Sequence, residues 1–151
     1  MLAARTVVQA MQGRIIGAST EAAARVYVGR GWPVDQFPAV RLVLQGEDLR
    51  DDPEDITWPR TRTHVLSVEA RCLAQDLDDP EAAADRLALQ VLLALEGTDA
   101  ASRLDPLPGC TLASTRIDRT TQSDGEATLG VAAITFDVLF STASNDPETL
   151  I

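Results

Sequence analysis

The sequence predicts an α+β fold, with an antiparallel or mixed β-sheet of four to five strands and two main helices packed on one face, in the order αβββαββ. Three observations predict it. Apolar residues recur with helical spacing over residues 2–15 and 80–96. Polar and apolar residues alternate after residue 61, as in a strand with one covered face. Two further strand-like segments follow, separated by an Asp-Gly turn signal.

Composition and charge narrow the class of protein. The 151 residues match one domain, and 45% hydrophobic with 24% charged residues is typical of a globular chain. The 23 acidic residues against 13 basic ones give a formal net charge of -10, which argues against a module that grips phosphate backbones. No apolar run is long enough for a membrane-spanning helix, and the first residues lack a secretory signal pattern.

The first half of the chain begins with an amphipathic helix over residues 2–15. Its apolar residues share one stripe: Ala4, Val7, Val8, Met11 and Ile15. A short strand follows at Val26–Val28, and a half-buried strand is predicted over residues 39–45, where Val40, Leu42 and Leu44 alternate. Residues 47–55 hold six acidic residues, one arginine and one proline, so we expect an exposed, mobile loop.

A long strand and a second helix occupy the middle of the chain. The strand begins near Thr61, and one of its faces carries His64, Leu66, Val68, Ala70 and Cys72. Asp79 is placed to cap a helix that starts at Pro80 and runs to Glu96. We expect Gly97 to end this helix in a left-handed conformation.

The second helix is apolar on two faces. One face carries Ala84, Leu87, Ala88, Val91 and Leu95, while Leu89 and Leu93 spread onto another. A helix that is apolar on most sides needs cover on most sides. Two possibilities remain for what covers the second face: a second copy of the chain or the first helix of the same chain.

Two strands complete the predicted sheet. Residues 111–121 form a threonine-rich strand, and Asp124-Gly125 signals a hairpin to a strand over residues 127–141. Apolar residues alternate along that last strand: Ile134, Phe136, Val138 and Phe140. We expect a single domain over residues 1–142 and a flexible, polar tail over residues 143–151.

The sequence offers no pattern for catalysis, a cofactor or a metal. His64 is the only histidine, and no nucleophile motif accompanies it, so we interpret it as a hydrogen-bonded residue at the edge of the core. Residues 47–55 lack the EF-hand spacing and its glycine, which favours a solvated charged segment. Cys72 and Cys110 are interpreted as two reduced, buried thiols. We therefore expect no enzyme.

Protein interfaces favour arginine and tryptophan, and several such residues stand out here. The alternative for the arginines is that they neutralise their own acidic neighbours. As candidate subunit contacts we take Leu89, Leu93, Arg116 and Arg119. As candidate contacts with other proteins we take Trp58, Arg60, Arg62, Asp48, Asp51 and Asp52.

The order of elements, together with several segments, resembles the tail terminator (tail completion) proteins of long-tailed bacteriophages or phage-like particles. The resemblance spans about Leu2 to Ser141, and it lies in the order of the elements and in the types of residue within them. It is carried by the opening helix, the charged loop, the two last strands and four segments: Val-Tyr-Val (26–28), Phe-Pro-Ala-Val-Arg-Leu-Val-Leu (37–44), Val-Glu-Ala-Arg-Cys (68–72) and Pro-Glu-Ala-Ala-Ala-Asp-Arg-Leu-Ala (80–88).

The resemblance implies a structural role without catalysis. Such proteins form a hexameric ring on the head-proximal end of the tail tube, stop tube polymerisation and offer a joining surface to the head connector. The implied partners are further copies of the chain, the tail tube protein and the head-tail connector protein, with DNA passing through the ring without specific binding and no membrane involved. The implied location is the tail or neck of a virion, assembled in the host cytoplasm.

Two alternatives stay open. Another neck component, such as a head-tail adaptor or a head completion protein, shares the size, the ring habit and the acidity. A small dimeric ligand-binding domain or enzyme belongs to a different class, and a concave pocket lined by His64 and carboxylates would favour it.

Overall fold

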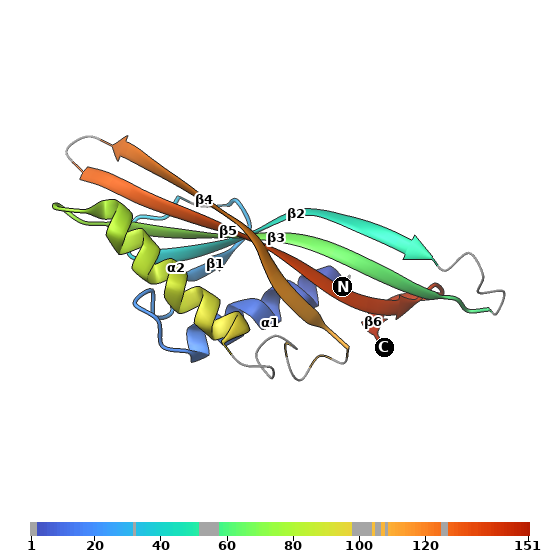
Figure 1. Ribbon diagram of the computed structural model, residues 1–151. Coiled ribbons are helices and arrows are strands. Elements are labelled where there is room, and N and C mark those ends of the chain that lie inside the picture. Colours follow the sequence, from blue (N-terminus) through green and yellow to red (C-terminus); the bar gives the residue numbers. More distant parts are fainter. Residues whose placement is uncertain are drawn as a thin grey trace.

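The computed structural model describes residues 3–31, 33–51, 58–97, 104, 107, 109–124 and 127–151. It confirms the α+β fold and its order of elements (Figure 1). The elements are α1 (Ala3–Gly17), β1 (Val26–Val28), β2 (Ala39–Asp51), β3 (Thr61–Gln75), α2 (Pro80–Glu96), β4 (Thr111–Asp124), β5 (Ala127–Ala143) and β6 (Asp146–Leu150). No helix within the described ranges is long and apolar enough to cross a membrane.

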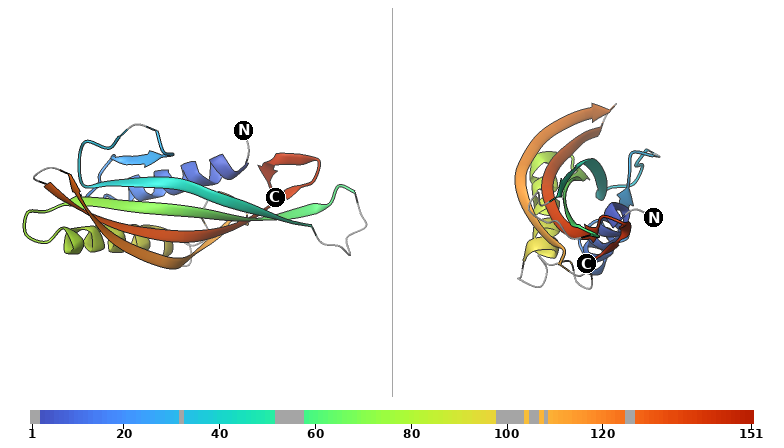
Figure 2. Two further views of the ribbon diagram at one scale, coloured as in Figure 1. Left: turned by 90° about the horizontal axis from the view of Figure 1, so that it is seen from above. Right: turned by 90° about the vertical axis from the view of Figure 1, so that its right-hand side faces the viewer.

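The six strands form one open, mixed sheet. Its order is β1-β2-β3-β5-β4, and β6 pairs with β5 beyond the end of β4. β1 runs parallel to β2, whereas the other neighbours are antiparallel. Figure 2 shows that the sheet is strongly twisted and curved. β3 and β5 pair along all of β3, so they form the centre of the sheet.

Both helices cover the same face of the sheet. Alternate residues of β3 from His64 to Ala74 are buried, as the sequence predicts, and so are the alternate residues Ile134 to Phe140 of β5. α2 contacts β3, β4 and β5, while α1 contacts β1, β2, β6 and α2. The buried side chains of both helices and of this sheet face form one core. The apolar residues at helical spacing and the apolar residues that alternate along the strands therefore pack together in a single layer.

The two ends of α2 are fixed in different ways. Asp79 caps the helix, since its Oδ1 accepts a hydrogen bond from the Ala82 amide at 3.0 Å, as predicted. The first turn lies so close to β5 that a Cβ on Gly130 would stand 2.0 Å from the Pro80 carbonyl oxygen. The prediction for Gly97 was wrong: its φ is -65°, and its amide continues the helical pattern by donating to the Leu93 carbonyl at 3.0 Å.

The acidic segment after Gly46 is the largest difference from the prediction. We expected a loop over residues 47–55, but Glu47–Asp51 continue β2 and pair with β3 from Leu66 to Arg62. A bulge between Leu44 and Gly46 shifts the register at this point. Residues 52–57 lie outside the described part. We call the paired segments 47–51 and 61–66 the arm; Figures 1 and 2 show it extending away from the helices.

The end of the chain also differs from the sequence prediction. The hairpin at Asp124-Gly125 is supported by the pairing of Asp124 with Ala127. Beyond β5, the chain folds back, and residues 146–150 form β6, with Thr142 opposite Leu150. The sequence of β6 shows no alternation of polar and apolar residues that would have predicted this strand. The flexibility of residues 143–151 stays a prediction.

Candidate functional site

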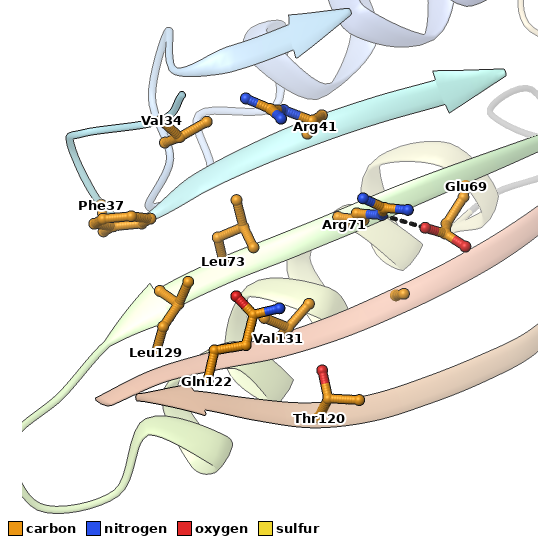
Figure 3. A pocket seen from close by; sticks show the side chains of 11 residues that line it. Val34, Phe37, Arg41, Glu69, Arg71, Leu73, Thr120, Gln122, Leu129 and Val131 are labelled. Carbon is orange, nitrogen blue, oxygen red and sulfur yellow. Dashed lines mark hydrogen bonds and ion pairs between the residues drawn. The ribbon is translucent and has the colours of Figure 1, made fainter. Parts of the chain in front are cut away.

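A groove lies on the sheet face opposite the two helices, and it spans four neighbouring strands (Figure 3). Its volume is about 460 Å³. The lining residues are Val34, Phe37, Arg41, Glu69, Arg71, Leu73, Thr120, Gln122, Leu129, Val131 and Ala133. The face predicted to be the polar side of the sheet is therefore hollowed and partly apolar.

The groove is charged at one end and apolar at the other. Arg71 Nε donates to the carboxylate of Glu69, two residues earlier on the same face of β3, and this ion pair neutralises both charges. Phe37, Leu73 and Leu129 line the other end, as Figure 3 shows. Glu69 is the only carboxylate among the lining residues. An ion pair at a partly exposed site of this kind contributes little to stability.

His64 lies on the opposite face and does not contact the groove. Its Nδ1 is 2.5 Å from Glu47 Oε1 and its Nε2 is 2.7 Å from Thr142 Oγ1. The ring stacks on Phe140 with centroids 4.5 Å apart. Thr142 is completely buried, which leaves no access for a substrate to its hydroxyl. The prediction of a hydrogen-bonded histidine at the edge of the core is confirmed, and the contact joins the base of the arm to β5.

The arm carries three of the six residues expected to contact other proteins, and two more lie next to it. Trp58, next to the arm, is 74% exposed and Leu49 is 55% exposed. Arg62 donates two hydrogen bonds to Asp51, at 2.9 and 3.2 Å. These bonds and the charge of Arg62 hold the pKa of the Asp51 carboxyl below its ordinary value. Asp48 is exposed on β2.

Arg60 and Asp52 complete the set of expected contacts with other proteins. Arg60 is exposed, and its backbone amide donates to Ser144 Oγ at 3.0 Å. Asp52 lies outside the described residues. The structure thus places Trp58, Arg60, Arg62 and Asp51 near the free end of the arm, as Figure 1 lets the reader follow along β2 and β3.

The second apolar face of α2 stays uncovered. Leu89 is 56% exposed and Leu93 is 60% exposed, one helical turn apart, although α1 contacts α2 elsewhere. The first helix is therefore not the cover of these two leucines. The predicted core face of α2 is buried, with Leu87, Val91 and Leu95 fully enclosed.

The two arginines of β4 are ion-paired within the chain. Arg116 Nε lies 2.9 Å from Asp118 Oδ1, and Arg119 Nε lies 2.8 Å from Asp85 Oδ1 on α2. All four side chains are largely exposed. The alternative that these arginines neutralise acidic neighbours therefore describes the isolated chain; their role as subunit contacts stays a prediction.

The sheet has two long open edges. Among the described residues β4 pairs with β5 alone, so its other side has no strand partner, although the Ser114 amide donates to Glu96. β2 pairs with β1 only over Val40–Leu42, so its outer side is free from Val43 onward. Unpaired strand edges present backbone donors and acceptors to any extended segment that approaches.

Sequence reasoning missed the role of Glu96. Its carboxylate accepts hydrogen bonds from the amide and the hydroxyl of Ser114, beside a bulge in β4. An acidic residue at a helix C-terminus opposes the helix dipole. That unfavourable placement was the one available signal that Glu96 serves a specific contact.

The cysteines are free and buried, as expected from their number and spacing. Burial raises the pKa of the Cys72 thiol to about 12 and that of Cys110 to about 11. Both are therefore protonated at neutral pH. Over the residues that the structure describes, no three His, Cys, Asp or Glu side chains come together as metal ligands would.

The chain resembles solved protein structures, but it has no match among families or curated sequences. No protein-family model matches the chain, and no curated protein matches it in sequence. A chain from the virion of a native gene transfer agent (GTA) particle is similar in structure, with a TM-score of 0.46 and 16% sequence identity. The match covers 88% of this chain and 97% of that one.

Proposed function

We propose that the chain is a structural virion protein that forms a ring on the head-proximal end of a tail tube. There it ends tube polymerisation and presents the joining surface for the head connector. We also propose that it is not an enzyme. The support comes from the resemblance of the sequence to tail terminator proteins and from the surfaces that one subunit leaves uncovered.

The observation that carries the proposal is that one subunit exposes two unlike surfaces. One is the stripe of Leu89 and Leu93 on α2, and the other is the pair of open strand edges on β2 and β4. A ring closes when one patch of a subunit contacts a different patch of the next. Two unlike patches suit this kind of contact better than a two-fold dimer, which needs one self-complementary patch.

The arm supplies a contact to a neighbouring ring in this proposal. Trp58 and Leu49 are exposed apolar groups on an extension with little core of its own. Exposed aromatic residues are frequent anchors of protein interfaces. Asp51 and Arg62 hold each other at the free end, which limits the side-chain freedom lost on docking.

The acidic balance suits a ring through which DNA moves. A formal charge of -10 on each copy repels phosphate groups, so DNA passes without a binding site that would hold it. Five of the surface arginines pair with carboxylates of the same chain, such as Asp85 and Asp118. The proposal therefore assigns no DNA-binding residue.

A head-tail adaptor or head completion protein is the nearest alternative, because it shares the ring habit. A dimeric ligand-binding domain is less well supported: the groove of Figure 3 contains Glu69 already paired with Arg71, and His64 lies on the other face. The mass in solution, measured over a range of concentrations, separates a ring-forming protein from a dimeric ligand-binding domain.

We expect either a hexamer or a monomer that assembles only when tubes are added. Leu93→Glu should abolish that assembly, because it places a charge in the contact. Leu77→Glu is the matched control, since Leu77 is 98% exposed outside the proposed contact. A concentration-independent dimer that both variants leave intact would contradict the ring.

A further inference from the structure

A second pocket lies at the edge of the sheet, beside the end of β1. We call it the edge pocket. Its volume is about 260 Å³. The lining residues are Arg5, Val8 and Gln9 of α1, Val28, Gly29 and Arg30 at the end of β1, and Val43 and Leu44 of β2.

The edge pocket lies where a neighbouring strand of β2 is missing. The β1 pairing ends at Val28 opposite Leu42, followed by one bond from the Gly29 amide to the Leu42 carbonyl at 2.8 Å. Gly29 has a φ of +92°, a conformation that turns the chain away from the sheet and favours glycine. β2 itself continues to Asp51 with β3 on one side only. A further extended segment therefore has a free strand edge to pair with.

The walls of the edge pocket are apolar. Val8 and Val43 are buried beneath it, while Val28 and Leu44 are each 44% exposed. Along a strand, alternate side chains point to opposite sides. A strand added here can place one apolar side chain in the pocket and turn the next one outward.

The rim of the edge pocket is positively charged. Arg5 and Arg30 line it, no carboxylate does, and neither arginine has an ion-pair partner within the described part of the chain. Five other surface arginines pair with acidic residues of the same chain, namely Arg62, Arg71, Arg86, Arg116 and Arg119, whereas Arg5 and Arg30 lie together at one pocket that has no carboxylate among its lining residues. In an acidic protein, two arginines left without acidic partners favour an occupant that brings carboxylates.

We propose that the edge pocket binds an extended, acidic segment of a partner protein by strand addition to β2. The segment's backbone pairs with β2 over Leu44 to Gly46, before the acidic residues of β2 begin at Glu47; an apolar side chain fills the pocket, and neighbouring carboxylates meet Arg5 and Arg30. This inference does not depend on the virion role.

The test uses a defined probe, a fluorescein-labelled peptide of about six residues in which valine and aspartate alternate. A valine-lysine peptide of the same length tests the charge. A third peptide with an N-methyl group on every amide removes the backbone donors of both edges. Binding to the full chain is followed by fluorescence anisotropy at low and high salt.

We expect the aspartate peptide to bind and the other two peptides not to bind. The double variant Arg5→Gln/Arg30→Gln should weaken the affinity about tenfold, and salt should weaken binding to the unchanged protein. Arg50→Gln is the matched control, because Arg50 lies on β2 but outside the pocket, and it should leave the affinity unchanged. Leu44→Asp should abolish binding, while Leu139→Asp, equally exposed on β5, should not.

Several results would overturn the proposal. Equal binding of the lysine peptide, or full affinity in the double variant, would remove the charge argument. Binding of the N-methyl peptide would show that no strand is added. Self-association of the unchanged chain that the double variant loses, without any binding of the aspartate peptide, would assign the edge pocket to a second copy.

Discussion

Replacing Thr142 by valine tests how the base of the arm is held. The change removes the hydroxyl that lies 2.7 Å from His64 Nε2 and keeps the side-chain shape. Thr142 is 0% exposed and His64 is 5% exposed, so water cannot replace the lost partner. A buried polar group without a partner costs about 1–3 kcal/mol. For a domain of this length, about 2 kcal/mol lowers the Tm by about 4–8 °C.

Thermal and urea unfolding followed by circular dichroism measure this cost. Thr120→Val is the matched control, because Thr120 is exposed on the other face, and we expect a change within about 0.5 kcal/mol. The double variant His64→Phe/Thr142→Val should cost less than the sum of the single changes, since no unpaired ring nitrogen then remains buried.

Two outcomes would refute this reasoning. If Thr142→Val unfolds with the same free energy as Thr120→Val, the contact with His64 does not stabilise the fold. If the double variant shows strictly additive losses, the two side chains are not coupled, and the base of the arm is held by strand pairing alone.

Three further changes have expected results. Gly130→Ala should destabilise the chain by about 1–3 kcal/mol in urea unfolding, because its Cβ would lie 2.0 Å from a backbone oxygen in the first turn of α2. Gly13→Ala is the control: no atom lies within 4 Å of its Cβ, so it should stabilise the chain by about 0.5–1 kcal/mol. Equal effects of the two changes would contradict the close approach at Gly130. Glu96→Gln should lower the unfolding free energy by about 1 kcal/mol, because a neutral amide replaces the carboxylate that accepts two hydrogen bonds at the β4 bulge, and an unchanged melting curve would argue against that contact. The folded state keeps the Cys72 proton up to a pKa of about 12, against an ordinary value of 9.0, so stability should fall by up to about 1.4 kcal/mol per pH unit above pH 9. Cys110, whose pKa is raised to about 11, contributes a similar loss above about pH 9, so Cys72→Ala should reduce this dependence without abolishing it, and an unchanged slope would exclude Cys72 as a cause.

The sequence predicted the elements whose signals are local. Strict alternation located β3 and its buried face, and the helical stripe located α1 and the core side of α2. The cap at Asp79 was recognisable because a short acidic side chain before proline is the usual start of a helix. These features depend on neighbours along the chain, so composition and period suffice to find them.

The features that the sequence did not predict depend on distant partners. Glu47–Asp51 form a strand although they are strongly acidic, because β3 supplies the pairing and His64 a partner for Glu47. β6 pairs with the last residues of β5, where β4 offers no partner because it begins only at Thr111, opposite Leu139. The groove and the edge pocket each combine residues from several elements, so no single segment announces them.

The expected interface residues divide in the same way. Leu89 and Leu93 could be picked out because a second apolar face of the helix is visible in the helical period, while its lack of cover is known only from the structure. The partners of Arg116 and Arg119 could not, since Asp85 on α2 meets Arg119 only through the fold.

Electron microscopy of the particles made with and without this chain tests the ring proposal most directly. The account predicts that particles lacking the chain carry overlong or headless tails, and that adding the unchanged protein restores joined tails of normal length. The Leu93→Glu variant should fail to restore them, while Leu77→Glu should succeed. Filled heads that lose DNA while tails keep their length would point to a head-side adaptor instead, and normal particles without the chain would contradict the account.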